Sequence, residues 1–208
     1  MNRKRLLIAA SPEIGAESWI RRNLLNIISD EYKITLIGNN KTAEKILKEK
    51  NIKINLIEGK YYFSKKEIKN LLLNCDYFLI FWDGVNLTNF VFEARLLKIP
   101  SKVIAIQVTE VVNKDRGDYY DIYIGRGTPW GNPFPVGPNE GQYSRDEAIS
   151  RFKEYFEKEI LSDESKRRGL LGMRGMRIAC HCKPFACHGD VIASYLNSLD
   201  PDDLAENN

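Results

Sequence analysis

Apolar runs and amphipathic segments alternate along the first half of the chain. Five runs have the length and composition of buried strands: residues 5–10, 33–38, 53–57, 77–82 and 103–108. Four segments between them place apolar side chains at helical spacing: residues 16–29, 41–49, 65–74 and 88–98. The third of these segments follows a capping box that begins at Ser64. This alternation predicts a parallel sheet with helices on both faces.

The pattern changes near residue 109. Charged residues replace the apolar periodicity over residues 109–118, and we place a domain boundary there. The pattern beyond it predicts, in order, a strand at 121–124, a helix from the capping box at Ser144 to about 161, a helix at 163–171, a strand at 177–179 and a final helix. We therefore expect an α/β protein with two domains, residues 1–110 and a smaller α/β domain at 118–199. An acidic tail at 200–208 is expected to be disordered.

The turn after the fourth predicted strand carries candidate ligand-binding residues. Ligands bind to parallel sheets at the carboxyl ends of the strands. Here the sequence FWDGVNLT joins an aromatic pair to a carboxylate, a glycine and a hydroxyl. We interpret Asp83, Gly84 and Thr88 as candidates for nucleotide or phosphate binding. The alternative is that the aromatic pair completes the core and Asp83 only caps the turn.

Residues 75–84, CDYFLIFWDG, resemble the hallmark strand and turn of the SLOG superfamily, close to its YspA-like branch. The likeness covers roughly residues 5–108, and it implies a Rossmann-like, nucleotide-binding domain. The superfamily usually has Gly-Ser-Arg after its first strand and Gly-Thr in its phosphate turn. This chain has Ala10-Ser11-Pro12 and Leu87-Thr88 instead. The lost glycines argue against catalysis by this domain, because a tight phosphate cradle requires their backbone freedom.

A second distinctive stretch begins at Gly125 and is rich in glycine and proline. Its glycines would let the backbone approach a ligand, Arg126 would hold a phosphate or carboxylate, and Trp130 would stack on a ligand. The candidate binding residues here are Gly125, Arg126, Gly127, Trp130, Gly131 and Asn132. The alternative is an irregular loop that is packed by its own aromatic side chains.

A dense cluster of reactive side chains follows the strand at 177–179. It holds three of the four cysteines and both histidines of the chain. The catalytic candidates are Cys180, Cys182, Cys187, His188 and Asp190, with Lys183 as a further phosphate-binding candidate. In this interpretation one thiol is a nucleophile whose pKa is lowered by nearby cations and a helix N-terminus, while His188 and Asp190 move protons.

Two other interpretations of this cluster stay open. Cys180, Cys182, Cys187 and His188 supply the four ligands of a tetrahedral zinc site, although the Cys-x-Cys spacing and the adjacent Cys187-His188 pair fit such a site poorly. The same side chains could also only pack the strand-to-helix turn.

Together the two stretches resemble an uncharacterised bacterial and phage family, domain of unknown function 4326. The likeness rests on the motifs GRG, WGNPF and CxCKPxxCHGD and covers nearly all of residues 120–196. The resemblance implies an association with phage nucleotide metabolism and brings no established mechanism.

Composition narrows the classes of protein further. The 208 residues carry a formal net charge of +3, so charge alone gives little support to nucleic acid as a partner but leaves it open. No apolar run reaches membrane-spanning length, and the N-terminal apolar stretch is too short for a signal peptide. We therefore expect a cytoplasmic protein, in the host cytoplasm if a phage encodes it, with reduced cysteines and without membrane contact.

These observations favour a protein that binds and processes a nucleotide or a nucleotide-derived small molecule. We expect hydrolase or transferase chemistry at an N-glycosidic or similar bond, without a cofactor. One alternative is a sensor or sponge that only binds a nucleotide messenger. Another is a module that uses zinc as a structural cofactor and contacts nucleic acid or a protein. A homodimer is a possible assembly because SLOG proteins often dimerise.

Overall fold

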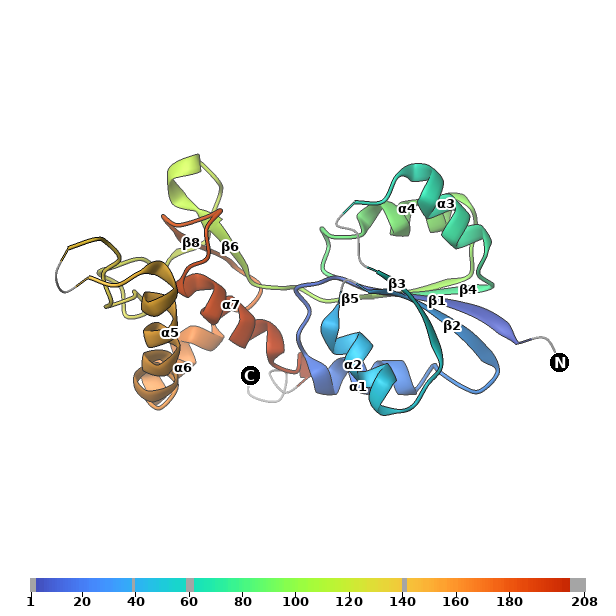
Figure 1. Ribbon diagram of the computed structural model, residues 1–208, viewed down its shortest axis with the longest axis horizontal. Helices are drawn as coiled ribbons and strands as arrows, with labels where there is room; N and C mark the ends of the chain where they lie inside the picture. The colour runs from blue at the N-terminus through green and yellow to red at the C-terminus, as the bar shows by residue number, and fades with distance from the viewer. Residues whose placement is uncertain (1–2, 39, 59–61, 140–141, 203–208) are drawn as a thin grey trace. The chain divides into compact units, whose positions relative to one another are not determined.

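The computed structural model describes residues 3–38, 40–58, 62–139 and 142–202. It divides into two compact units, of which the first comprises residues 1–107 with 198–208 and the second comprises residues 108–197. Each unit has its own parallel sheet (Figure 1). In the described part of the chain no helix combines the length and the apolar character needed to cross a membrane.

The first unit contains a five-stranded parallel sheet. Its strands are β1 (Lys4–Ala10), β2 (Tyr32–Gly38), β3 (Ile54–Glu58), β4 (Tyr77–Trp82) and β5 (Ser101–Ala105). They lie in the order β3-β2-β1-β4-β5. This is the strand order of a doubly wound α/β sheet, in which the chain reverses direction across the sheet between β1 and β4.

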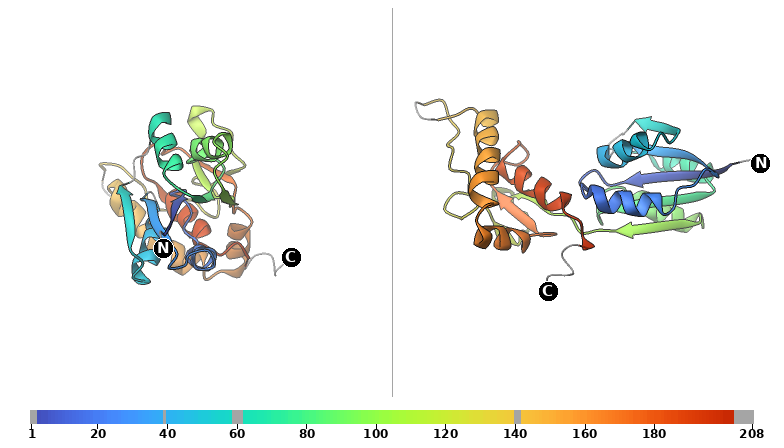
Figure 2. Two further views of the ribbon diagram at one scale, coloured as in Figure 1. Left: turned by 90° about the vertical axis from the view of Figure 1, so that its right-hand side faces the viewer. Right: turned by 90° about the horizontal axis from the view of Figure 1, so that it is seen from below.

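Helices cover both faces of this sheet, which confirms the mixed α/β architecture expected from the sequence. The helices are α1 (Glu17–Leu25), α2 (Lys41–Glu49), α3 (Lys65–Leu73) and α4 (Thr88–Leu96). Figures 1 and 2 show α1 and α2 on one face of the sheet and α3 and α4 on the other. The capping box at Ser64 is confirmed, since its side chain accepts from the Glu67 N–H and the Glu67 carboxylate accepts from the Ser64 N–H.

Side chains of the central strands point to both faces of the sheet and enter two different cores. Leu7 of β1 and Phe78 of β4 pack with Phe90 of α4 in one apolar cluster. Phe81 of β4 packs edge-on against Trp19 of α1, with ring centroids 5.6 Å apart. Burial on both faces explains why these strands are uninterrupted apolar runs in the sequence.

The second unit contains a three-stranded parallel sheet in the order β6-β8-β7. Its strands are β6 (Glu110–Asn113), β7 (Ile122–Tyr123) and β8 (Arg177–Cys180). Its helices are α5 (Arg145–Tyr155), which continues as a π-helical turn (Phe156–Ile160), α6 (Glu164–Leu171) and α7 (His188–Ser198). The second capping box, at Ser144, is also confirmed. Aromatic side chains join α5 and its π-helical turn to α7, through the pairs Phe152–His188 and Phe156–Tyr195.

Two segments differ from the sequence interpretation. Residues 109–118 were interpreted as a boundary, but they carry β6 and a 3₁₀ turn (Lys114–Arg116). The pairing of β6 with β8 supplies the hydrogen bonds that this short strand cannot make locally. Asp200 belongs to the tail that was expected to be disordered, yet it is buried and accepts a 2.7 Å hydrogen bond from the Ser18 hydroxyl. It also accepts hydrogen bonds from the Arg22 guanidinium, while residues 203–208 lie outside the described residues.

Candidate functional site

The carboxyl ends of the three strands in the second unit meet at one edge of the sheet. The central strand β8 pairs in register with both neighbours, so that Cys180 lies opposite Asn113 of β6 and Ala179 lies opposite Tyr123 of β7. The residues that follow these positions are therefore neighbours, although they are far apart in the sequence. Ligands bind at such an edge in parallel sheets.

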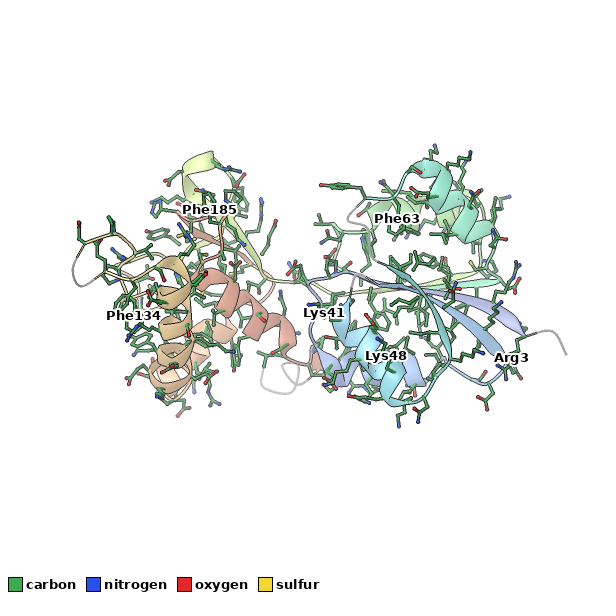
Figure 3. All side chains as sticks on the ribbon, in the orientation of Figure 1. Arg3, Lys41, Lys48, Phe63, Phe134 and Phe185 are labelled. Atoms are coloured by element: carbon green, nitrogen blue, oxygen red, sulfur yellow. The ribbon has the colours of Figure 1, made fainter. Side chains whose placement is uncertain are left out.

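A cavity of about 290 Å³ lies at this edge, within the second unit. Its polar lining consists of Tyr123, Arg126, Asn132, Arg145, His181 and His188. Its thiols are Cys180, Cys182 and Cys187. Gly125 and the side chains of Phe134, Val136, Ala148 and Ile149 contribute much of the remaining wall. Phe134, which is labelled in Figure 3, lies beside α5. Its ring meets the Tyr155 ring edge-on, with the ring centroids 6.3 Å apart.

Two of the candidate cysteines form a buried pair. The Cys180 and Cys187 Sγ atoms lie 3.2 Å apart, and the Cys182 N–H donates to Cys180 Sγ at 3.3 Å. The hydrogen bond from the Cys187 thiol, together with that N–H, lowers the pKa of Cys180 to about 5. The same hydrogen bond, burial and the Asp190 charge raise the pKa of Cys187. These opposite pKa shifts favour the thiolate form of Cys180 and the protonated form of Cys187.

His188 is anchored in the wall of the cavity. Its Nε2 lies 2.9 Å from the carbonyl oxygen of Ile124, and its ring meets Phe152 edge-on. A carbonyl only accepts hydrogen bonds, so Nε2 carries a proton and donates it. His188 can act on a ligand only through its other ring nitrogen, which restricts the proton-moving role expected of it.

Asp190 and Lys183 stabilise the N-terminus of α7. One Asp190 carboxylate oxygen pairs with the Lys183 ammonium group, and the other accepts a 2.8 Å hydrogen bond from the Cys187 N–H. This reach from the first turn back to the residue before the helix is half of a capping box. Neither residue lines the cavity. Their expected roles in catalysis and phosphate binding therefore stay predictions without support from this geometry.

Two glycines of the loop, Gly125 and Gly131, allow neighbouring atoms to pack closely against the backbone. A Cβ atom on Gly125 would lie 1.9 Å from Tyr123 Oη, and one on Gly131 would lie 2.6 Å from the Gly125 carbonyl oxygen. Gly127 has φ +90° and open space around it. Arg126, between two of these glycines, is exposed and has no hydrogen bond or ion pair to any residue in the described ranges. Its guanidinium is therefore available to a ligand.

The side chains of Trp130 and Asn132 mainly stabilise the conformation of the loop. A Cβ atom on Gly169 of α6 would lie 3.1 Å from Trp130 Cζ2, so the indole packs closely against that helix. The expected stacking of Trp130 on a ligand is therefore not supported, because the ring faces α6 and does not line the cavity. Asn132 lines the cavity, but its side chain accepts from the Phe134 N–H and donates to the Ala148 carbonyl.

Arg145 is a cavity residue that the sequence interpretation did not single out. It is the first residue of α5, and its guanidinium donates to the Ala186 carbonyl at 3.2 Å and lies over the Phe185 ring. Its charge also favours the thiolate form of Cys182, whose pKa is nevertheless raised by burial and by Cys180. With Arg126 it makes the cavity attractive to an anion.

Asp115, Tyr123 and His181 form a hydrogen-bonded chain at the cavity; sequence reasoning placed His181 in the reactive cluster without a role and missed the other two. His181 Nδ1 lies 2.8 Å from an Asp115 carboxylate oxygen, and His181 Nε2 lies 2.9 Å from the Tyr123 hydroxyl. Asp115 was hidden because its segment was interpreted as a domain boundary. The apolar pair Val111-Val112 at the start of this segment was the signal that could have indicated a strand there.

The polar candidate side chains of the first unit form hydrogen bonds within their own turn. Asp83 is buried, and its carboxylate accepts from the Val85 N–H, the Asn86 N–H and the Asn86 side-chain amide. The Thr88 hydroxyl donates to the Val85 carbonyl and accepts from the Trp82 indole. Gly84 has φ +89°, which favours glycine at this turn. These contacts match the interpretation of Asp83 as a turn cap.

The four residues of the alternative zinc interpretation are not arranged as a metal site in the described part of the chain. Within the described residues, no three or more His, Cys, Asp or Glu side chains are grouped so that they could hold a metal ion. The Cys180 and Cys187 sulfur atoms face each other, and the Nε2 of His188 donates to a carbonyl. The donor set of Cys180, Cys182, Cys187 and His188 therefore does not fit zinc in this structure.

Comparison with known proteins identifies relatives of the second unit. Residues 109–198 match a family model described as "Domain of unknown function (DUF4326)". The "Uncharacterized 12.4 kDa protein in nrdA-td intergenic region" of Enterobacteria phage T4 is 46% identical over 98 residues, which are 47% of this chain and 86% of the phage protein.

Two solved structures are distantly similar to this chain. The tRNA N6-threonylcarbamoyladenosine dehydratase TcdA of E. coli, in complex with AMP, is 11% identical with a TM-score of 0.34, over 98% of this chain and 85% of that one. A short-chain dehydrogenase/reductase of Veillonella parvula, in complex with NADP, is 13% identical with a TM-score of 0.31, over 87% and 95% of the two chains. Scores this low do not define a common fold. None of these relatives confirms the resemblance of residues 5–108 to SLOG proteins.

Proposed function

The chain belongs, through residues 109–198, to the family described as Domain of unknown function (DUF4326), and we propose that its cavity binds and processes a nucleotide or nucleotide-derived small molecule. The reaction proposed is hydrolysis or group transfer at an N-glycosidic or similar bond. One observation carries the proposal: the Cys180 sulfur, which is paired with the Cys187 sulfur at 3.2 Å, and the unpaired guanidinium of Arg126 belong to residues that line the same cavity.

Charge at the cavity supports a phosphorylated ligand. Arg126 has no partner among the described residues, and Arg145 uses one guanidinium nitrogen for the Ala186 carbonyl. Guanidinium groups match the geometry of phosphate oxygens and stay charged at all physiological pH values. No carboxylate lines this cavity. An anionic group is therefore favoured in this cavity.

The apolar wall supports a flat ring as the other part of the ligand. Phe134, Val136 and Ile149 line the cavity, and Phe134 is held between the rings of Tyr143 and Tyr155. A nucleobase offers a large apolar face with polar edges, which suits such a surface. The volume of about 290 Å³ lies at the lower end of the range for ligand pockets, which favours a mononucleotide over a larger ligand.

The cysteine pair supports covalent chemistry at the anomeric carbon. In the first step the Cys180 thiolate attacks this carbon, a C–S bond forms, the C–N bond breaks, and the leaving base takes a proton from water. In the second step the oxygen of a water molecule or an acceptor hydroxyl attacks the same carbon and loses its proton. The C–S bond then breaks and the thiolate of Cys180 returns.

A mixed pool of nucleoside monophosphates tests the proposal. The purified chain is first weighed by native mass spectrometry and then incubated with the pool, and the products are separated by chromatography. We expect a free base, and a protein adduct with the sugar phosphate after rapid acid quenching. Cys180→Ser should form neither, whereas Cys75→Ser, a buried cysteine of the first unit, should form both.

Two other outcomes would overturn this reaction. A nucleotide that copurifies and stays intact would make the protein a sensor or sponge. Stoichiometric zinc without a small molecule, with unfolding by chelator, would make it a zinc-stabilised module.

A further inference from the structure

We propose that Asp115, His181 and Tyr123 form a proton relay, in which Tyr123 is the general base that activates the attacking hydroxyl in the cavity of the second unit. This inference rests on the proposed function, because the hydroxyl belongs to the water or acceptor that releases the sugar from Cys180. The observation that carries it is the pair of hydrogen bonds on the two nitrogens of one imidazole ring.

The topology of the sheet brings the three residues together. Asp115 follows β6, Tyr123 ends β7, and His181 follows β8. Because the three strands are parallel and in register, their carboxyl ends deliver one residue each to the same edge. The Asn113 side chain fixes the turn that carries Asp115, since its oxygen accepts the Asp115 N–H at 2.8 Å.

The hydrogen bonds determine the tautomer of His181. The Asp115 carboxylate can only accept, so Nδ1 of His181 carries the proton and donates it over 2.8 Å. Nε2 of the neutral ring is then an acceptor, and the Tyr123 hydroxyl donates to it over 2.9 Å. In this arrangement Asp115 orients the ring and stabilises the imidazolium that forms when His181 takes a proton.

Tyr123 is held so that its oxygen stays at the cavity. Its hydroxyl lies directly over Gly125, where a Cβ atom would be 1.9 Å from Oη. The Lys114 ammonium lies 4.5 Å from the centroid of the Tyr123 ring. Tyr123 lines the cavity together with Arg126 and Cys180, and its hydroxyl lies against two further lining residues, His181 and Gly125.

The relay moves one proton. The attacking hydroxyl gives its proton to Tyr123 Oη while the original Tyr123 proton passes to His181 Nε2. The new C–O bond forms and the C–S bond to Cys180 breaks. His181, which is about half exposed at 48%, then returns its proton to water. This replaces the proton that the leaving base took from water. Tyr123 is thus the catalytic residue, and His181 and Asp115 are positioning residues that act through it.

The chain contains a matched control. Tyr119 also hydrogen-bonds an aspartate, Asp121, over 3.0 Å, but it is exposed and does not line the cavity. Tyr119→Phe therefore removes a comparable hydrogen bond without touching the relay. Tyr123→Phe keeps the ring over Gly125 and removes only the hydroxyl.

The first test needs no substrate. The chain has only two histidines, so ¹⁵N spectra of histidine-labelled protein resolve both rings. We expect His181 to show protonated Nδ1 and bare Nε2, and His188 to show the opposite tautomer because it donates from Nε2. Asp115→Asn should shift His181 toward a mixture of tautomers, and Tyr119→Phe should leave it unchanged. A mixed His181 tautomer in the wild-type chain would overturn the relay.

The second test uses the nucleoside monophosphate pool described above. Tyr123→Phe should lower kcat by ~10²-fold or more with little change in KM, because release of the sugar from Cys180 becomes slow. The covalent adduct should still form and should accumulate. Asp115→Asn should show a smaller fall in kcat, and Tyr119→Phe should match the wild type. Full turnover by Tyr123→Phe would overturn the relay alone. A wild-type chain that forms no product would overturn the proposed reaction and the catalytic role of the relay with it.

Discussion

The sulfur atoms of Cys180 and Cys187 lie 3.2 Å apart, although Cys180 ends β8 and Cys187 precedes α7. The turn between them folds back so that the end of the strand and the start of the helix share one buried contact. Both side chains are almost fully buried, and both line the cavity. This contact lowers the pKa of one thiol and raises the pKa of the other, because the thiol that keeps its proton donates a hydrogen bond to the sulfur that loses its own.

This contact predicts that Cys180 is a thiolate at neutral pH. Thiolate absorbance in the ultraviolet, taken as the difference between the wild-type chain and Cys180→Ser, should fall only as the pH drops toward about 5. The folded pKa lies below the value of an unfolded cysteine. The stability that the thiolate contributes is therefore present above the unfolded pKa of about 8.5, and is lost as pH falls through about 5.

Two variants check the cause of this shift. Cys187→Ala removes the donor and should move the inflection of the Cys180 absorbance upward. Cys75 serves as the control, because burial raises its pKa to about 11 and Cys75→Ser should leave the absorbance at neutral pH unchanged. A wild-type inflection near the ordinary thiol value would contradict the assignment.

The same pair should also form a disulfide under mild oxidation. Hydrogen peroxide would oxidise the Cys180 thiolate to a sulfenic acid with release of water, and the Cys187 thiol would then displace a second water to close the S–S bond. Peptide mass spectrometry should find Cys180 joined to Cys187, with the loss of two hydrogens. In Cys187→Ala the sulfenic acid should persist and react with dimedone. A cross-link from Cys180 to Cys182 instead would show that the pairing seen here is not the reactive one.

Gly125 is expected to be essential for the position of Tyr123. In Gly125→Ala the new methyl group would overlap the tyrosine hydroxyl, so the ring must move and its hydrogen bond to His181 should break. The displaced atoms are the far end of a half-buried side chain, so the main loss is its hydrogen bond to His181, which is worth roughly 0.5–1.5 kcal/mol of unfolding free energy. The ¹⁵N spectrum of His181 should change in this variant. Gly127→Ala is the control, because its Cβ would enter open space and only the backbone at φ +90° would be strained.

Local signals in the sequence predicted much of the fold. The capping boxes at Ser64 and Ser144 depend on residues three positions apart, and both form as expected. The strands β1 and β4 were found because burial on both faces leaves a continuous apolar run in each.

The strand β6 was missed because its stability is not local. It has only four residues, and charged side chains follow it closely. Its pairing with β8 depends on a partner far along the chain. The Asp115–His181–Tyr123 chain was missed for the same reason, since it exists only once three strand ends are in register. The Cys/His cluster was visible because its members are close in sequence as well as in space.

Asp83 is expected to contribute to stability and not to ligand affinity. Asp83→Ala would remove the acceptor of the Val85 and Asn86 N–H groups; both residues are exposed, so water can replace that acceptor in part, and we expect a loss of roughly 1 kcal/mol. Urea denaturation should show this loss, and Asp30→Ala, which removes an exposed carboxylate, should show little change. Normal stability of Asp83→Ala combined with lost nucleotide binding would instead support the ligand-binding interpretation of this turn.

Asp190 gives a comparable test in the second unit, where the sequence suggested catalysis and the structure shows a helix cap. Asp190→Asn should weaken both the pairing with Lys183 and the hydrogen bond from the Cys187 N–H. It also removes a negative charge from the first turn of α7, where the helix dipole favours one. We expect a loss of about 1 kcal/mol in urea denaturation, with the Cys180 thiolate absorbance retained at neutral pH. Asp118→Asn, an exposed carboxylate of the same unit, is the matched control. If Asp190→Asn kept full stability and the thiolate but lost turnover, Asp190 would be a proton-moving residue and not a cap.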